Sequence, residues 1–181
     1  MSLEKLMDTS RIKWINSPGP DSDIVISSRV RFARNIRNVP FPHLLSDNEA
    51  KKIVNDVYFT LKENLVLSRD IELYNMSELT AEQKTMLSEM HLISMDLANS
   101  EKGAVIVNQD ESISIMINEE DHLRIQVMLP GLQLEEALKQ IDKIDDLLEE
   151  KLDFAFDEKI GYLTACPTNV GTGMRASVMM H

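Results

Sequence analysis

The stretch AVIVNQDESISIMINEEDHLRIQVM, residues 104–128, contains three apolar runs that are separated by short polar segments. The runs at 104–107 and 113–117 have the length and composition of strands, and the polar residues between them form a turn. In the third run, 122–128, leucine, isoleucine and valine alternate with polar residues, as in a strand that buries one face. The stretch therefore predicts three consecutive strands of one sheet.

Helical patterns lie on both sides of these strands. Ser46 with Glu49, and Thr80 with Gln83, have the spacing of a capping box, which marks the start of a helix. Apolar residues with helical period follow the first box, and a third apolar helical face lies after residue 131. The predicted helices cover 47–65, Thr80 to about His91, and about 133–151.

Further β-prone runs occupy 24–26, 71–74, 161–165 and 174–179. Strands mixed with covering helices indicate an α+β fold, with an antiparallel sheet flanked by helices. Because 181 residues are enough for one core and not obviously for two, residues 1–23 are interpreted as a lead-in and 24–181 as one domain. The chain ends inside a β-prone run without a turn, so we expect the domain to be truncated.

Composition narrows the class of protein. Hydrophobic residues make up 43% and charged residues 27%, which is typical of a folded globular protein rather than a disordered one. No apolar run approaches the roughly 20 residues of a membrane helix, and the N-terminus lacks the apolar region of a secretory signal. A single cysteine excludes an internal disulfide and favours the cytoplasm. The net charge of −11 argues against a general nucleic-acid binder.

The first polar segment that could take part in binding or catalysis is Ser27-Ser28-Arg29-Val30-Arg31. Arg29 and Arg31 would project from the same face of an extended strand. Two guanidinium groups on one face repel each other unless an anion lies between them, and arginine binds phosphate in a bidentate manner. The alternative is a pair of surface salt bridges.

The second segment is Asn118-Glu119-Glu120-Asp121-His122-Leu123-Arg124, and the third runs from Cys166 through two glycines to Arg175. Adjacent carboxylates at the end of a strand could hold a cation such as a guanidinium or act as bases. An acidic hairpin turn and a metal site are the alternatives. The glycines of the third segment would let the backbone approach a ligand, and Cys166 is either an activated thiolate near cations or a small core residue.

Together these segments resemble the signature segments of the ATP:guanidino phosphotransferase, or phosphagen kinase, family. They occur in the family's order, and the resemblance extends from Ile24 to His181. It is closest to the bacterial branch, whose members phosphorylate arginine side chains of proteins. The short N-terminal lead-in, and the segments 91–94 and 161–164, carry this part of the resemblance.

The resemblance implies roles for individual residues. Glu120 matches the carboxylate that holds the guanidinium and acts as catalytic base, Glu119 its helper, and Cys166 the reactive cysteine beside the guanidinium. The implied ATP-binding residues are Ser27, Ser28, Arg29, Val30, Arg31, His91, Arg124, Arg175, Ala176, Ser177, Val178 and Met179. Mg²⁺ is expected to be held mainly through the nucleotide, because no dedicated metal motif is present.

The resemblance also implies partners: proteins with exposed arginines, among them a basic heat-shock repressor, a zinc-binding activator protein and, indirectly, the Clp protease. Complete members are roughly twice this length, so the 181 residues alone are expected to have little or no kinase activity and could pair through an exposed strand edge as a homodimer. Three alternatives stay open: a kinase for a free guanidino compound, a non-catalytic nucleotide-binding module, and a cation-binding domain that uses the acidic segment.

Overall fold

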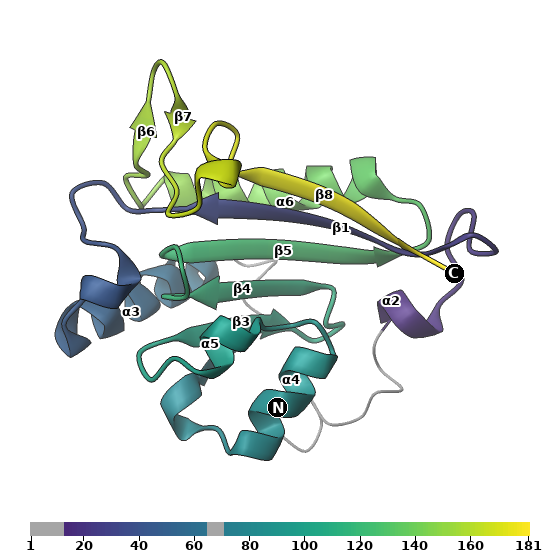
Figure 1. Ribbon diagram of the computed structural model, residues 1–181, viewed down its shortest axis with the longest axis horizontal. Helices are drawn as coiled ribbons and strands as arrows, with labels where there is room; N and C mark the ends of the chain where they lie inside the picture. The colour runs from purple at the N-terminus through teal and green to yellow at the C-terminus, as the bar shows by residue number, and fades with distance from the viewer. Residues whose placement is uncertain (1–12, 65–70) are drawn as a thin grey trace.

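The computed structural model describes residues 13–64 and 71–181, so residues 1–12 of the expected lead-in and the last residue of the predicted helix 47–65 lie outside it. Its centre is a six-stranded sheet in the order β2-β3-β4-β5-β1-β8, with antiparallel pairing throughout (Figure 1). The strands are β1 Val25–Arg34, β2 Ile71–Asn75, β3 Ala104–Asn108, β4 Ile113–Ile117, β5 Leu123–Pro130 and β8 Met174–Met180. The predicted antiparallel sheet is confirmed.

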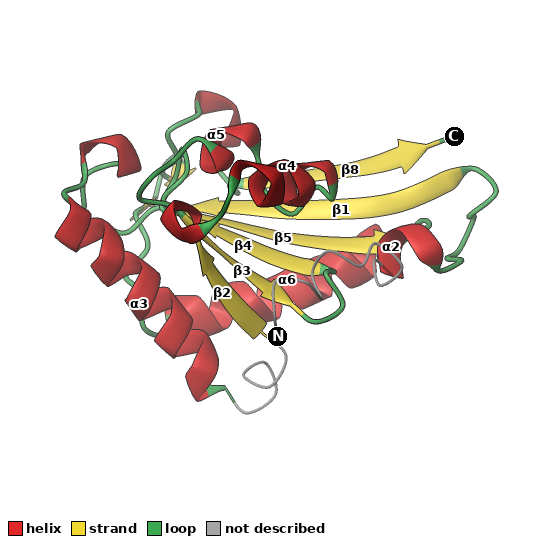
Figure 2. Ribbon diagram, turned by 90° about the horizontal axis from the view of Figure 1, so that it is seen from below, coloured by secondary structure: helices red, strands yellow, loops and turns green. Residues whose placement is uncertain are grey.

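Helices cover both faces of the sheet (Figure 2). The α-helices are α2 Lys13–Asn16, α3 Asp47–Glu63, α4 Ala81–Glu89, α5 Met95–Ala98 and α6 Leu134–Glu149. Short 3₁₀ turns occur at η2 Pro42–Leu44, η3 Met76–Glu78 and η4 Pro167–Asn169, and a separate hairpin consists of β6 Phe156–Asp157 and β7 Gly161–Tyr162. None of the helices in the described ranges is long and apolar enough to span a bilayer.

Two apolar cores lie on opposite faces of the sheet. The larger core joins strand residues such as Phe32 and Ile125 to the apolar sides of α3 and α6. The smaller core joins Met116 and Met128 to α4, α5 and Trp14 of α2. The lead-in therefore contributes a buried tryptophan to the fold, which its sequence pattern did not predict. Strand β8 stays outside both cores, since all of its residues are exposed.

Local sequence signals position the helices. Both predicted capping boxes are present: Ser46 accepts from the Glu49 amide at the start of α3, and Thr80 accepts from the Gln83 amide at the start of α4. Helix α4 ends at Glu89, two residues before the predicted end, because the chain turns there and His91 adopts a φ of 57°. The predicted strand at 24–26 and the arginine segment after it form one strand, β1.

The predicted strand over 161–165 is wrong beyond Tyr162, where β7 ends. The Leu163 amide still donates to the Ala155 carbonyl at 2.8 Å, but the backbone groups beyond it have side-chain partners instead of a neighbouring strand. The Ala165 amide donates to the Asp121 carboxylate at 2.7 Å, and the Thr164 hydroxyl donates to the Cys166 carbonyl at 2.8 Å. A side chain that takes a backbone partner in this way competes with regular pairing and ends the strand.

One buried ion pair fixes three parts of the chain to one another. The Arg34 guanidinium at the end of β1 donates to Asp145 of α6 at 2.7 and 3.1 Å, and both side chains are at least nine-tenths buried. Its third nitrogen donates to the Thr172 carbonyl at 3.1 Å, and the guanidinium carbon lies 3.6 Å from the ring centre of Tyr162. Arg34 thereby anchors the glycine-containing loop that leads into β8.

We expect Arg34→Ala to lower the free energy of unfolding by about 3–5 kcal/mol, because it leaves the Asp145 carboxylate buried without a cation. Urea unfolding followed by far-UV circular dichroism measures this. Arg37→Ala is the matched control, since its ion pair with Asp153 is exposed and is worth about 1 kcal/mol or less. Equal losses in the two variants would contradict this role of Arg34.

Candidate active site

Four arginines project from one face of the sheet. Arg29 and Arg31 lie two residues apart on β1, and in the strand register Arg31 is directly opposite Arg175 of β8. On the other side of β1, Arg124 of β5 is opposite Ala33. Because cross-strand partners and residues two apart share a face, all four side chains lie on the same side. The expectation that Arg29 and Arg31 share a face is confirmed, and the tertiary structure adds the other two.

These arginines perturb one another. Burial, followed by repulsion from Arg29, Arg124 and Arg175, lowers the pKa of Arg31 to about 10, and Glu119 opposes this shift. Burial, followed by Arg175 and Arg124, also lowers the pKa of Arg29. An anion bound among these guanidinium groups would favour their charged forms, so the cluster is a candidate anion site.

Three of the arginines share a cavity with two of the three predicted catalytic residues, Glu120 and Cys166. This phosphate-side cavity has a volume of about 130 Å³. It is lined by Arg31, Phe32, Ala33, Glu120, Arg124, Cys166, Asn169, Gly173 and Arg175. Strands β1, β5 and β8 supply the arginines, the β4–β5 turn supplies Glu120, and the loop before β8 supplies Cys166. Cationic, anionic and nucleophilic side chains from distant parts of the sequence therefore meet in one place.

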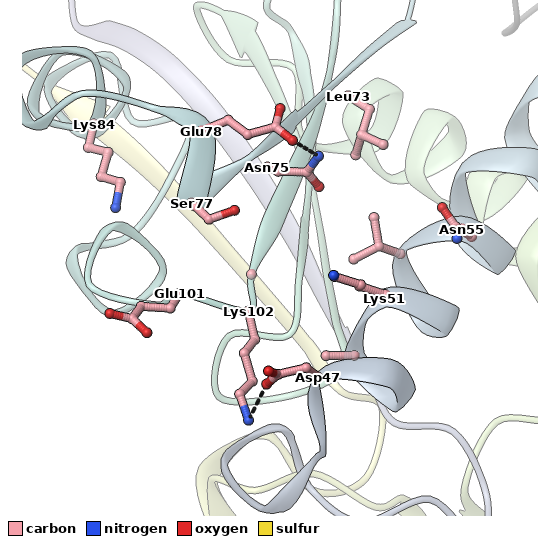
Figure 3. A pocket seen from close by; sticks show the side chains of 13 residues that line it. Asp47, Lys51, Asn55, Leu73, Asn75, Ser77, Glu78, Lys84, Glu101 and Lys102 are labelled. Atoms are coloured by element: carbon pink, nitrogen blue, oxygen red, sulfur yellow. Dashed lines mark hydrogen bonds and ion pairs between the residues drawn. The ribbon is translucent and has the colours of Figure 1, made fainter.

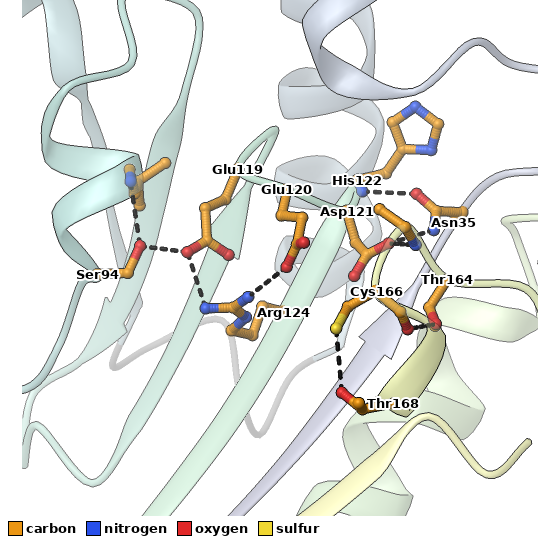
Figure 4. Close-up of polar contacts among 12 residues, drawn as sticks. Asn35, Ser94, Glu119, Glu120, Asp121, His122, Arg124, Thr164, Cys166 and Thr168 are labelled. Atoms are coloured by element: carbon orange, nitrogen blue, oxygen red, sulfur yellow. Dashed lines mark hydrogen bonds and ion pairs between the residues drawn. The ribbon is translucent and has the colours of Figure 1, made fainter. Parts of the chain in front are cut away.

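The two carboxylates of the acidic turn have different surroundings (Figure 4). The Glu119 side chain is fully buried, and it accepts from Arg124 at 2.8 Å and from the Ser94 hydroxyl. Burial raises its pKa against the opposing effect of Arg124. Glu120 has a 44% exposed side chain and one oxygen 3.4 Å from Arg124. Glu119 is therefore engaged in holding Arg124, whereas Glu120 can receive a cationic ligand.

A second hollow, the base-side cavity, contains another part of the predicted nucleotide segment. Its volume is about 190 Å³, and it is lined by Trp14, Ser27, Arg29, His91, Met128, Ser177, Val178 and Met179. Trp14 and His91 face each other with ring centres 5.8 Å apart, and Arg29 donates to the Ser177 hydroxyl at 3.3 Å. Sequence reasoning missed Trp14, although it is the chain's single tryptophan.

Some predicted nucleotide-binding residues point elsewhere. Val30 is a core residue, 1% exposed, and Ala176 is its partner in the register of β8, on the same opposite face. Ser28 is fully buried; it donates to the Gly131 carbonyl at 2.7 Å and accepts from the Gln133 amide at 2.8 Å. These side chains do not line either cavity, so a contact with nucleotide would have to use their backbone.

The loop that carries Cys166 is shaped by glycine. The thiol of Cys166 lies 3.0 Å from the Thr168 hydroxyl. Gly173 has a φ of 64°, and a Cβ atom there would lie 2.6 Å from the Ala33 carbonyl oxygen. Since the Ala33 amide also donates to the Gly173 carbonyl at 2.8 Å, the close approach of the loop to β1 requires glycine at this position.

A wider cavity than these two lies away from these residues (Figure 3). It has a volume of about 700 Å³ and lies between α3, the edge strand β2 and the segment before β3. Three lysines, Lys51, Lys84 and Lys102, and three carboxylates, Asp47, Glu78 and Glu101, line it, so that its charges balance. Within residues 13–64 and 71–181, no cluster of three or more histidine, cysteine or acidic side chains could hold a metal ion.

The antiparallel sheet, the arginine cluster and the adjoining carboxylate together define a guanidino-kinase type of catalytic domain. Residues 49–181 match the family model of the ATP:guanido phosphotransferase C-terminal catalytic domain. The chain belongs to the ATP:guanido phosphotransferase family.

Similar proteins agree with this family. Over its full length the chain is 50% identical to the protein-arginine kinase of Pelotomaculum thermopropionicum and 54% identical to that of a Geobacillus species. It spans 52% and 51% of those two proteins, about half of their length.

Solved structures show the same fold. A taurocyamine kinase from Schistosoma mansoni, with bound components of a transition-state analogue, has a TM-score of 0.80 and 26% identity over 90% of this chain and 24% of its own. A lombricine kinase has a TM-score of 0.76 and 23% identity over 98% of this chain and 58% of its own, which bears on the fold alone.

We expect inorganic triphosphate to raise the melting temperature of the chain, and salt to weaken this effect, because an anion relieves the repulsion among the arginines. Arg31→Gln should lose most of this gain without lowering the melting temperature of the free protein. The pKa of Arg31 is depressed, so its charge costs stability at every pH below about 10, and the substitution removes that cost.

Differential scanning fluorimetry at pH 7 measures both effects, with Arg37→Gln as the matched surface control. A triphosphate-induced shift that is the same in Arg31→Gln as in the unaltered chain would contradict the assignment of an anion site.

Proposed function

We propose that this chain carries the site at which a kinase transfers the γ-phosphoryl group of ATP to the guanidinium group of arginine side chains in proteins. The observation that carries the proposal is the phosphate-side cavity. There Arg31, Arg124 and Arg175 face Glu120 and Cys166. The arginines fit the polyphosphate of a nucleotide, and the carboxylate fits a planar cation beside it.

The reaction needs positioning and charge neutralisation more than covalent help. A guanidinium nitrogen attacks the γ-phosphorus, and a nitrogen–phosphorus bond forms as the bond to the β,γ-bridging oxygen breaks. The electron pair leaves with ADP. The proton of the attacking nitrogen passes to the Glu120 carboxylate, which also holds the substrate cation. The arginines neutralise the charge on the phosphoryl oxygens.

Glu119 and Ser94 support this arrangement indirectly. Glu119 accepts from both Ser94 and Arg124 and so fixes the Arg124 guanidinium at the wall of the cavity. Cys166 lines the same cavity as Glu120, where its thiol can contact the guanidinium nitrogens. An acidic turn without function would not account for the buried Glu119 carboxylate, which orients the Arg124 guanidinium.

The nucleotide has a natural direction in the site. With its γ-phosphate at Arg31, Arg124 and Arg175, the rest of the molecule extends along β1 and β8 toward Arg29 and the base-side cavity. That end is lined by His91, Ser27, Ser177 and Trp14. Mg²⁺ would come with the nucleotide and add positive charge at the phosphates, since the described residues have no metal cluster of their own.

Protein arginine is favoured over a free guanidino compound as the substrate. The relatives that are 50% and 54% identical over the length of this chain are named protein-arginine kinases, whereas the taurocyamine and lombricine kinases are 26% and 23% identical. The net charge of −11 also favours basic protein partners. Competition between free arginine and an arginine-rich protein discriminates the two substrates.

From the resemblance to the bacterial protein-arginine kinases, we also propose that the protein is cytoplasmic and acts in a stress response. Its phosphoarginine products would mark proteins for the Clp protease and relieve a basic heat-shock repressor, and a zinc-binding activator protein would be its partner. A pull-down with a zinc-loaded candidate activator tests the last of these.

We expect the chain to bind ATP, and Arg124→Ala to weaken binding by about 10- to 100-fold, because one charge-assisted phosphate contact is worth about 1.5–3 kcal/mol. Titration calorimetry with ATP and Mg²⁺ measures this, with Arg37→Ala as the control. If the ATP affinity is unchanged in Arg124→Ala, the proposal that the phosphates of ATP bind in this cavity is wrong.

Turnover is a separate measurement. The chain is incubated with ATP, Mg²⁺ and an arginine-rich protein, and acid-labile phosphate on arginine is counted. That the 181 residues alone transfer little stays a prediction, so the signal is scored against Glu120→Gln, which should abolish any transfer while leaving ATP affinity within about twofold. Measurable transfer that is equal in both chains would exclude Glu120 as the base.

A further inference from the structure

A buried carboxylate next to the proposed base has no part in the chemistry described so far. Asp121 follows Glu120 in the acidic turn and is fully buried. One of its oxygens accepts two hydrogen bonds, from the Asn35 side-chain amide at 2.6 Å and from the Ala165 backbone amide at 2.7 Å (Figure 4). Ala165 directly precedes Cys166, so Asp121 joins the two segments that carry the proposed base and the thiol.

Asn35 completes the connection from the end of β1. Its amide nitrogen donates to the Leu163 carbonyl at 3.0 Å as well as to Asp121, and its oxygen accepts from the His122 amide at 2.9 Å. His122 is held in turn, because its Nδ1 accepts from the Ile36 amide at 3.0 Å and its Nε2 lies 2.8 Å from the Pro40 carbonyl. The acidic turn and the loop before Cys166 are thus both bonded to the buried Asn35 side chain.

We infer that Asp121 is a positioning residue, which clamps the acidic turn to the cysteine loop and so sets the separation of Glu120 from Cys166 across the cavity. The inference rests on the proposed function of that cavity. Hydrogen bonds to a carboxylate are short and directional, and two that converge on one oxygen fix the spacing of their donors. Without them, the loop from Leu163 to Thr172 would keep its bonds from Asn35 at one end and Arg34 at the other, and would lose the bond next to the thiol.

The physical argument favours a positioning role over a role in stability alone. A buried carboxylate is costly, and the other oxygen of Asp121 has no partner among the described residues. An apolar side chain of similar size could fill the space without that cost. What an apolar side chain could not do is accept from Asn35 and Ala165 at once.

The test compares Asp121→Ala and Asp121→Asn with Asp153→Ala and Asp153→Asn, which alter an exposed aspartate of the same fold. Asparagine keeps an oxygen in the accepting position, so Asp121→Asn should behave like the unaltered chain. Two local readouts are used: amide hydrogen exchange at Ala165, followed by NMR, and the rate of alkylation of Cys166, the single thiol of the chain, by iodoacetamide.

In Asp121→Ala we expect exchange at Ala165 and alkylation of Cys166 to accelerate at least about tenfold, while exchange at core amides such as Val127 changes little. Parallel acceleration of all amides would show a loss of global stability and overturn the clamp. So would unchanged alkylation, or an Asp121→Asn chain that behaves like Asp121→Ala. If the alanine chain does not fold, Asp121→Ser, which leaves room for a water, takes its place.

A kinetic readout separates this inference from the proposed function. In phosphoryl transfer to an arginine-rich protein, Asp121→Ala should lower kcat by at least about tenfold with the KM for ATP unchanged, and Asp121→Asn should restore it. A KM effect alone would overturn the positioning role. If the unaltered chain transfers no phosphate, as is predicted for the 181 residues alone, the kinetic comparison gives no result, and exchange and alkylation decide the clamp.

Discussion

The site depends on the repulsion among guanidinium groups that the strand register holds on one face of the sheet. Strand β1 pairs with β5 on one side and β8 on the other, and this pairing brings Arg124 and Arg175 beside Arg31. Burial, and then repulsion from the neighbouring arginines, lowers the pKa of Arg31, so the cluster is unfavourable by itself and favourable around a polyanion. The fold bears this cost because the opposite face of the same strands is thoroughly apolar.

The two faces of the sheet therefore have separate tasks. One face packs Phe32, Ile125 and their neighbours against α3 and α6 and supplies most of the buried apolar area. On the other face, α2, α4 and α5 cover part of the sheet and leave the arginines accessible beside β8. Because successive side chains of a strand point to opposite faces, the same strands can carry a rigid core on one face and a charged ligand site on the other.

Around this sheet, buried polar groups connect the loops to the site. Arg34 with Asp145 holds the glycine loop, and Asp121 with Asn35 holds the segment before Cys166. Both networks join residues more than 80 positions apart in the chain. A loop that supplies functional groups gains precision from such anchors, since its own backbone has few neighbours.

The sequence by itself determined the strands of the six-stranded sheet, both capping boxes and the shared face of Arg29 and Arg31, because these depend on neighbours within one helix turn or one strand. The family followed from the order of the motifs. Only the tertiary structure decided that Trp14 lines the base-side cavity, that Ser28 and Val30 point into the fold, and that Asp121 reaches Ala165. Those contacts depend on strand order and on buried partners from distant segments, which local periodicity does not encode.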